Sequence, residues 1–305
     1  MKAIRIREYG DASTLKLEDT PQLSVEHDQL LVKIRDAGVN PIDWKIRAGY
    51  LKERMHSAFP LTMGQDFAGE VAELGHGTSG FAPGDRVFGF AQGTYAEYAV
   101  AQSSTIAAMP VSMAFDVAAS LPTPGSTALQ LVRDVVGAKA GMRILIHGAA
   151  GSVGSLAVQI AKHLGARVIG TATGPDISYL RTLGVEEVID YKLERFEDSV
   201  SEADAVIDLV GGDTLDRSYA VIRRGGVLAT TVGQINEAAA QRAGIRGFHV
   251  VMKRDAADLV ELAKLVDSGT VKSRLGQTLP LAQAREAQEL NEKGKVAGKV
   301  VLKVA

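Results

Sequence analysis

The sequence predicts an α/β protein in which a doubly wound parallel sheet is inserted into a β-rich domain. Three observations lead to this fold class. Strand-like and helical segments alternate through the middle of the chain, whereas short apolar runs separated by turn residues fill its first part. The last segment returns to that first pattern. We therefore expect domains at residues 1–124 and 125–268, with residues 269–305 rejoining the first domain.

Short apolar runs bounded by Gly, Pro, Asp and Asn predict an antiparallel barrel or sandwich in the first domain. In the middle of the chain, apolar runs alternate with segments whose apolar residues recur every three or four positions, as in helices buried on one face. The end of the chain reads as a short helix followed by an alternating strand. In chain order, we expect strands at 30–35, 68–74, 85–89, 95–100, 143–147, 167–171, 186–190, 204–210, 226–232, 247–252 and 298–304, and helices at 155–164, 176–183, 256–266 and 281–291.

Composition narrows the function classes. A net charge of −2 argues against partners such as nucleic acid or an anionic membrane surface. The sequence contains no cysteine, which excludes disulfides and thiolate catalysis and removes the ligand that structural zinc sites prefer. No stretch reaches the ~18 uninterrupted apolar residues of a membrane-spanning helix. We expect a cytoplasmic protein.

A glycine-rich turn between an apolar run and an amphipathic helix predicts a dinucleotide site. Such a turn lets backbone approach a pyrophosphate, and the helix start offers free N–H groups and a positive dipole end. The pattern is a variant of G-x-G-x-x-G, with alanine at the first glycine position. An ordinary βαβ unit with a glycine-rich turn is the alternative. The residues expected to contact the pyrophosphate are Ala149, Gly151, Ser152, Val153 and Gly154.

The second strand of this unit ends without the carboxylate that binds the 2′-hydroxyl of NAD. Thr171 and Thr173 stand there, and the first acid is Asp176. Two hydroxyl groups without negative charge suit the 2′-phosphate of NADP(H), and Arg181 and Tyr191 could join them. No basic residue follows the strand immediately.

Two further strands of the middle domain end in glycine-containing turns. Val210-Gly211 and Val232-Gly233 lie at the edge where a doubly wound sheet binds its ligand, and we expect the nicotinamide carboxamide to lie against them. Glycines that serve the turns alone are the alternative.

Four motifs resemble the medium-chain dehydrogenase/reductase superfamily, in the zinc-free branch that includes quinone oxidoreductases, zeta-crystallin and plant enone and alkenal reductases. They are Asn40-Pro-Ile-Asp-Trp-Lys45, Met63-Gly-Gln-Asp-Phe-Ala-Gly69, Pro83-Gly-Asp-Arg-Val87 and His147-Gly-Ala-Ala-Gly-Ser-Val-Gly154. The resemblance runs from residue 1 to the final strand. It implies a GroES-like catalytic domain, an inserted Rossmann domain, NADPH as hydride donor, and a homodimer formed through the edge strand near Phe248–Val251.

The resemblance also bears on metal and catalysis. In zinc-dependent relatives a cysteine near Asn40 and a Gly-His-Glu motif bind catalytic zinc, and here the second motif is Gly64-Gln65-Asp66, so we expect no metal. Hydrogen-bond donors would then stabilise the substrate oxygen, each by about 3 kcal/mol. The residues expected from this comparison are Asn40, Lys45 and Tyr50 as catalytic groups, with Asn40 and Thr127 near the nicotinamide.

For some of these residues and their neighbours, a purely structural role is the alternative. Lys45 could be a solvated helix residue, and for Asp43 and Arg47 an i,i+4 ion pair is the preferred interpretation. His147 is interpreted as structural. Taken together, the sequence predicts an NADPH-dependent oxidoreductase that reduces small-molecule quinones or α,β-unsaturated carbonyl compounds. The alternative is an NADPH-binding protein of crystallin or redox-sensor type with little turnover.

Overall fold

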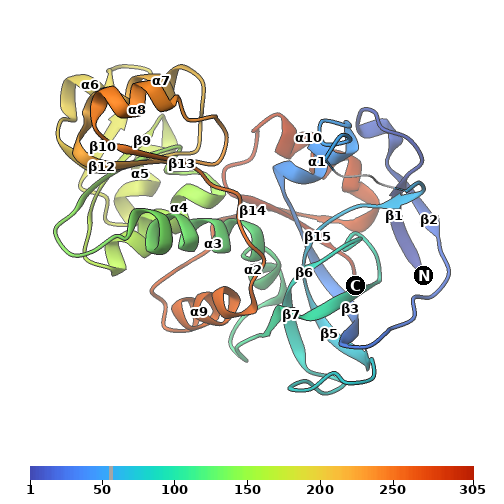
Figure 1. Cartoon of the computed structure of the whole chain (residues 1–305). Coiled ribbons are helices and arrows are strands. Elements are labelled where there is room, and N and C mark those ends of the chain that lie inside the picture. The colour runs from blue at the N-terminus through green and yellow to red at the C-terminus, as the bar shows by residue number, and fades with distance from the viewer. Residues whose placement is uncertain (55–57) are drawn as a thin grey trace. The chain divides into compact units, whose positions relative to one another are not determined.

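The computed structural model describes residues 1–54 and 58–305. The chain forms two compact units (Figure 1). Unit 1 comprises Met1–Thr123, Arg254–Ser268 and Ser273–Ala305, and unit 2 comprises Pro124–Lys253 and Gly269–Lys272. In the described part of the chain, no helix is both long and apolar enough to cross a membrane.

Unit 2 is built on a six-stranded parallel sheet with the order β10-β9-β8-β11-β12-β13. The chain starts in the middle of the sheet, moves outward to β10, returns to the centre and moves outward again to β13. This is the doubly wound order of a Rossmann fold, and the predicted fold class is confirmed. The strands are β8 (Arg143–His147), β9 (Arg167–Ala172), β10 (Glu187–Asp190), β11 (Ala203–Asp208), β12 (Ile222–Thr230) and β13 (Arg246–His249).

Helices connect these strands. The helix α4 (Ser152–His163) follows β8; most of its residues are buried, and Lys162 and His163 complement the dipole in its last turn. A preceding helical segment starts with α3 (Pro122–Leu129) and continues as a π-helical turn at Gln130–Val136. The remaining connections contain α5 (Pro175–Thr182), α6 (Phe196–Ser199), α7 (Asp213–Ser218) with a 3₁₀ turn at Tyr219–Val221, and α8 (Glu237–Ala243).

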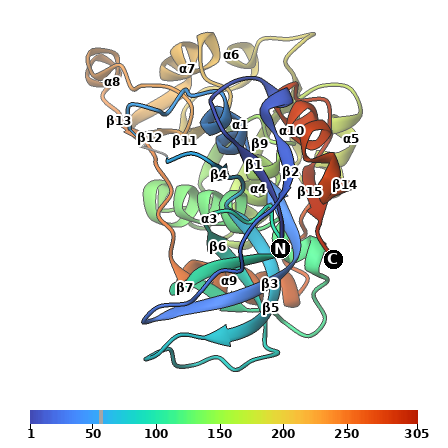
Figure 2. The same cartoon turned by 90° about the vertical axis from the view of Figure 1, so that its right-hand side faces the viewer.

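Unit 1 contains a closed β barrel (Figure 2). The strand β3 (Gln29–Val39) pairs with β5 (Asp66–Leu74) and, through residues 29–33, with β7 (Tyr98–Ala108). The strand β6 (Arg86–Ala91) closes the ring between β5 and β7. Leu30, Ile34, Phe67, Val87 and Ile106 belong to its buried core. The barrel form of the two predicted alternatives is therefore the one adopted.

The end of the chain extends this barrel sheet. The strand β15 (Lys299–Lys303) pairs antiparallel with residues 36–39 of β3, and β14 (Leu275–Pro280) pairs parallel with β15. The predicted helix at 281–291 is a 3₁₀ turn, Leu281–Gln283, followed by α10 (Ala284–Glu292). The other elements of unit 1 are β1 (Lys2–Ile6), a 3₁₀ turn at Ala12–Thr14, β2 (Lys16–Asp19), α1 (Pro41–Arg47), β4 (Leu61–Thr62), α2 (Phe115–Ala119) and α9 (Ala256–Asp267).

One helix differs from the predicted domain division. The sequence predicts the helix at 256–266 as part of the 125–268 domain. In the structure this helix, α9, belongs to unit 1, where it packs against β7 and β6. Leu259 and Leu262 are buried on its apolar face, and Asp267 accepts a hydrogen bond from Ser112 at 2.7 Å. The apolar periodicity defines a buried face without indicating which sheet covers it.

Candidate functional site

The turn after β8 has the geometry that a pyrophosphate requires. Gly148 adopts φ +69°, and its carbonyl oxygen accepts a hydrogen bond from the Gly151 N–H at 3.1 Å. The helix α4 then begins, with its first internal bond from the Ser155 N–H to the Gly151 oxygen at 2.9 Å. As at any helix start, the N–H groups of Ser152 and Val153 have no acceptor within the helix, and both residues are only partly buried.

A buried chain of hydrogen bonds supports this turn. Ser218 Oγ donates to the Thr214 oxygen at 2.7 Å, so it accepts from His147 Nε2 at 3.2 Å. His147 Nδ1 then accepts from Thr171 Oγ1 at 3.3 Å, and Thr171 Oγ1 accepts from the Gly148 N–H at 3.4 Å. Burial lowers the pKa of His147 to about 4, which keeps the ring neutral. This role agrees with the interpretation of His147 as a structural residue.

Two of the residues predicted to bind the cofactor are buried and help to support the turn. Ala149 is fully buried, and its N–H donates to the Thr171 oxygen at 3.4 Å. Thr171 is 4% exposed, and its hydroxyl group is already engaged with His147. The expected contact of Thr171 with a 2′-phosphate is therefore corrected, because its side chain is buried and bonded to His147 at the end of the neighbouring strand β8.

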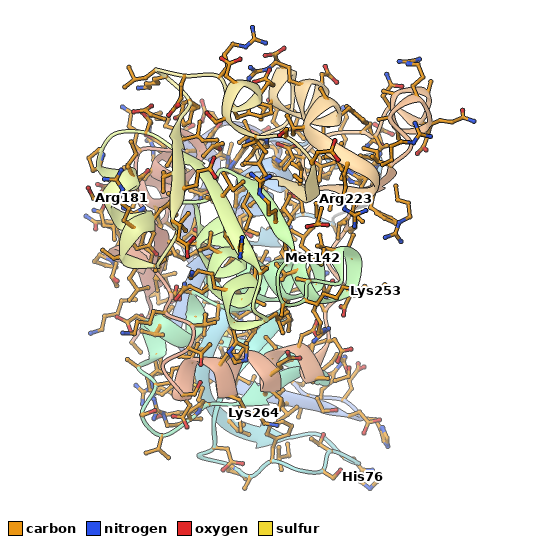
Figure 3. The ribbon with its side chains drawn as sticks, turned by 90° about the vertical axis from the view of Figure 1, so that its left-hand side faces the viewer. His76, Met142, Arg181, Arg223, Lys253 and Lys264 are labelled. Carbon is orange, nitrogen blue, oxygen red and sulfur yellow. The ribbon has the colours of Figure 1, made fainter. Side chains whose placement is uncertain are left out.

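Three other predicted residues are accessible: Thr173 and Tyr191 just after the carboxyl ends of β9 and β10, and Arg181 in the last turn of α5. Thr173 is half-buried just after β9, and Arg181 is exposed on α5, where its side chain is labelled in Figure 3. Tyr191 is 58% exposed immediately after β10. These three side chains are accessible, whereas that of Thr171 is buried.

Two buried side chains shape the turns after β11 and β12. Asp208 accepts hydrogen bonds at 3.1 Å from the N–H groups of Val210 and Gly211, and from Thr230 Oγ1 at 3.0 Å. Thr230 Oγ1 in turn accepts from the N–H groups of Val232 and Gly233, at 3.2 and 3.3 Å. Both strands therefore end two residues earlier than predicted, because these side chains capture the N–H groups that would have continued the ladder.

The same two turns expose the positions assigned to the carboxamide. Val210 is 55% exposed and Val232 is 47% exposed. The predicted Thr127 lies in α3 and is 7% exposed. Asp208 and Thr230 were not among the predicted site residues. Each is a polar residue at the end of an apolar run, and this pattern could have indicated their role in the turns.

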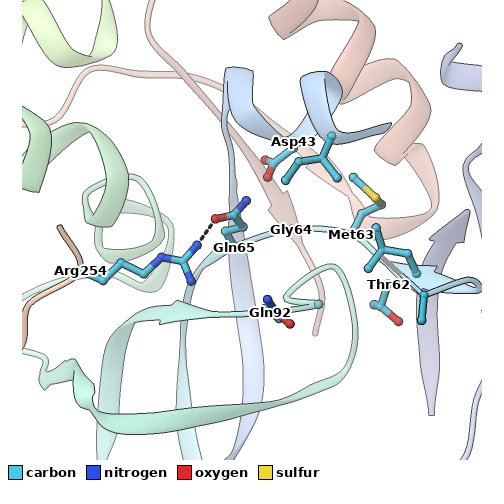
Figure 4. Close-up of a pocket in the computed structure, with 11 residues that line it drawn as sticks. Asp43, Thr62, Met63, Gly64, Gln65, Gln92 and Arg254 are labelled. Carbon is cyan, nitrogen blue, oxygen red and sulfur yellow. Dashed lines mark hydrogen bonds between the residues drawn. The ribbon is translucent and has the colours of Figure 1, made fainter. Parts of the chain in front are cut away.

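Unit 1 contains a pocket of about 420 Å³ (Figure 4). One side is formed by α1, another by the segment around β4, and Arg254 contributes a guanidinium group. Arg254 donates a hydrogen bond to Gln65, drawn as a dashed line, and lies 5.6 Å from the centre of the Phe90 ring. The lining residues are Asp43, Ile46, Ala58, Leu61, Thr62, Met63, Gly64, Gln65, Gln92, Gly93 and Arg254.

Asn40 and its neighbours form a buried polar cluster beside this pocket. Lys299, 2% exposed, donates to Asn40 Oδ1, and its Nζ lies 3.7 Å from Asp66 Oδ2. Asp66 also accepts from the N–H and the hydroxyl group of Thr123, at 3.0 and 2.5 Å. Burial lowers the pKa of Lys299. Asn40 Nδ2 is buried without a hydrogen-bond partner among the described residues.

Comparison with known proteins identifies the family. The model of the zinc-binding dehydrogenase family matches residues 183–302, and that of the alcohol dehydrogenase GroES-like domain matches residues 26–111. The chain is 32% identical over 317 residues to 2-methylene-furan-3-one reductase of Solanum lycopersicum, covering 99% of this chain and 79% of that protein. It belongs to the medium-chain dehydrogenase/reductase superfamily.

Solved structures place this superfamily member in the quinone oxidoreductase branch. The quinone oxidoreductase from Coxiella burnetii is 37% identical with a TM-score of 0.92, over 100% of this chain and 99% of that one. The quinone oxidoreductase of Escherichia coli, solved with NADPH, is 26% identical with a TM-score of 0.91, over 100% of both chains. The predicted family and fold are thereby confirmed.

In this dehydrogenase/reductase, the two other residues predicted to be catalytic lie away from the pocket in unit 1. Lys45 is half-buried, with its Nζ 5.6 Å from the centre of the Trp44 ring. Tyr50 is 73% exposed and packs edge-on against the same ring. Neither residue is among those that line the pocket. Lys45 is two positions from Asp43 on α1, which places it on the opposite side of the helix.

The expected ion pair between Asp43 and Arg47 is also corrected. Asp43 is fully buried, and its Oδ2 accepts from the Asn40 N–H and from the Tyr95 hydroxyl, each at 2.8 Å. Arg47 is 1% exposed and donates instead to Gln288 and Glu292 of α10, at 3.0 and 2.8 Å. The i,i+4 rule describes exposed helices, whereas both of these side chains point into unit 1.

Proposed function

We propose that the protein is an NADPH-dependent oxidoreductase that reduces quinones or α,β-unsaturated carbonyl compounds. The observation that carries this proposal is the open N-terminus of α4, which follows a glycine turn at the carboxyl edge of a parallel sheet. The NADPH complex of the E. coli relative supports the choice of cofactor. When bound, NADPH supplies a hydride.

The residues of unit 2 fit such a cofactor. A Cβ on Gly151 would meet only the Gly148 oxygen, at 3.3 Å, so the side of the turn at Gly151 is open to a phosphate. Ser152 and Val153 would donate N–H groups to the pyrophosphate, and Thr173, Arg181 and Tyr191 would surround the 2′-phosphate. The backbone of the turns at Val210-Gly211 and Val232-Gly233 would bind the carboxamide.

We propose that the reaction uses no metal. The two positions that correspond to zinc ligands hold Asn40 and Gln65, and each side-chain oxygen already accepts a hydrogen bond from a cation, Lys299 or Arg254. Asn40 Nδ2 would instead donate to the nicotinamide ribose or to the substrate oxygen. Full activity after exhaustive chelation, with substoichiometric zinc by mass spectrometry, would support this view; stoichiometric zinc required for turnover would contradict it.

Turnover separates an enzyme from an NADPH-binding protein with little catalysis. We expect the purified protein to oxidise NADPH in the presence of members of a panel of quinones, enones and short unsaturated aldehydes. Deuterium from labelled NADPH should appear at the β-carbon of a reduced enone. Tight NADPH binding without oxidation by any member of the panel would favour the crystallin or redox-sensor alternative.

Arg181 should set the preference for NADPH over NADH. An exposed arginine that donates to a phosphate contributes about 1.5–3 kcal/mol, so R181A should weaken NADPH binding roughly 10- to 100-fold. NADH lacks the 2′-phosphate, and its dissociation constant should stay unchanged; titration calorimetry with both cofactors measures this difference. Arg195, which pairs with Glu197 at 3.0 Å on the surface of unit 2, offers a matched control in R195A. Equal losses for both cofactors in R181A would contradict the assignment.

We also propose that the protein forms a homodimer through β13. The strand β13 is the terminal strand of its sheet. Phe248 within it is 37% exposed, and Val251, two residues after it, is 75% exposed. Exposed apolar side chains on an edge strand suit pairing with a second copy.

A further inference from the structure

The pocket of unit 1 contains a carboxyl group that the proposed function has not yet used. Asp43 lies in the wall formed by α1 (Figure 4), and the apolar residues Ile46 and Met63 also line this pocket. Asp43 is fully buried. Its charge is not needed to balance Arg47, which pairs with Glu292, and Lys299 is engaged with Asn40 and Asp66.

The two oxygens of this carboxyl group differ. Oδ2 accepts two hydrogen bonds, from the Asn40 N–H that opens α1 and from the Tyr95 hydroxyl. With both lone pairs occupied, Oδ2 cannot carry a proton. Oδ1 is buried and has no partner among the described residues. While Tyr95 and the Asn40 N–H both donate to Oδ2, a proton on Asp43 resides on Oδ1.

The surroundings favour that proton. Burial raises the pKa of Asp43 to about 7, and the neighbouring Asp66 carboxylate acts in the same direction. The two hydrogen bonds on Oδ2 and the ammonium group of Lys299 lower the pKa, but by less than burial raises it. On its own helix, Arg47 and Lys45 are directed elsewhere, and Arg254 is held by Gln65.

We propose that Asp43 is the general acid of this pocket, and that it donates the proton on Oδ1 to the carbonyl oxygen of a bound α,β-unsaturated ketone or aldehyde. This inference rests on the proposed function. Bound NADPH would supply a hydride to the β-carbon, and the electron pairs of C=C and C=O would then shift toward the carbonyl oxygen. That oxygen takes the proton, and the electron pair of the broken O–H bond stays on Asp43. The product is a neutral enol, which converts to the saturated ketone in water, and water returns the proton to Asp43.

The variant D43N separates proton donation from structure. Asparagine keeps an oxygen for the Asn40 and Tyr95 donors and places an NH₂ group where Oδ1–H stood, so it donates a hydrogen bond but cannot release a proton. We expect kcat/KM to fall at least ~100-fold, while the dissociation constants of NADPH and of a saturated ketone product stay unchanged. D36N is the control. Asp36 lies in β3, lines a different pocket and also has a raised pKa, about 6. Its replacement should leave kcat/KM unchanged.

The pH profile supplies the second measurement. In wild type, kcat/KM should fall as pH rises through about 7, when Asp43 ionises. Y95F removes a donor that stabilises the carboxylate, so this limb should move to higher pH; in D43N the limb should disappear. The infrared carbonyl band of a protonated carboxylic acid, recorded one unit below this pKa, should weaken in D43N relative to wild type. If D43N keeps the wild-type rate, or the limb is unmoved in Y95F, the proposal is overturned. Absence of turnover in wild type would overturn the proposed function as well.

Discussion

Replacing Gly154 with alanine is expected to destroy NADPH binding and to destabilise unit 2. A Cβ at this position would lie 2.2 Å from the Gly148 oxygen and 2.8 and 2.9 Å from Ala149 Cα and C. All three are backbone atoms of the turn, so no side-chain rotation relieves the clash. The helix α4 must move away from β8, and the turn must open.

The expected size follows from overpacking. Forcing extra atoms into a packed site costs about 1–3 kcal/mol, and backbone contacts this close place G154A at the upper end. The same displacement moves the N–H groups of Ser152 and Val153 away from the pyrophosphate. Thermal unfolding should show a lower midpoint, and fluorescence titration should show no saturable NADPH binding.

Gly151 is the matched control for that experiment. Its φ of −70° is allowed for alanine, and a Cβ would meet only the Gly148 oxygen, at 3.3 Å. G151A should therefore keep a nearly wild-type unfolding midpoint while weakening NADPH binding, because the methyl group occupies the open side of the turn. Unchanged NADPH affinity in G151A would place the pyrophosphate elsewhere, and a wild-type midpoint in G154A would contradict the packing at Gly154.

Replacing Lys299 with methionine should give the largest loss of stability in unit 1. The ammonium group is buried between Asn40 and Asp66, and its removal leaves the fully buried Asp66 carboxylate without its counter-charge. Breaking one side of a buried ion pair costs about 3–5 kcal/mol. Urea unfolding of K299M measures this difference.

Two companion variants test the cause. In K299M/D66N the uncompensated charge is gone, so the double variant should regain part of the stability lost in K299M. Lys2 forms an ion pair with Asp19 in which the two side chains are 50% and 77% exposed. K2M should change the free energy of unfolding by less than about 1 kcal/mol. A small effect of K299M, equal to that of K2M, would show that Lys299 does not neutralise Asp66 in the folded protein.

The parts of this protein that could be predicted from sequence depend on local patterns. The alternation of apolar runs and amphipathic helices defined the parallel sheet, and the spacing of Gly148, Gly151 and Gly154 indicated the turn. The same patterns also predicted the two strands that lead into the turns at Val210 and Val232. The ends of these strands were not predicted, because the side chains of Asp208 and Thr230 compete with the ladder for N–H groups, and no periodicity records that competition.

The parts that could not be predicted depend on partners far along the chain. Asp43 was interpreted through Arg47, its neighbour on the helix, whereas its actual donor Tyr95 is 52 positions away. Arg47 finds Gln288 at a separation of 241 positions. Lys299 appears in the sequence as one of two lysines in an alternating strand, and only the tertiary structure shows that it is the buried one.

The turns held by Asp208 and Thr230 offer a route for redesigning ligand preference. These two side chains hold the backbone from inside the sheet, so the conformations at Val210 and Val232 do not depend on which side chains those positions carry. Libraries that vary residues 210 and 232 should therefore yield mostly folded variants. Such libraries could be screened directly for new cofactor analogues, without a prior round of selection for stability.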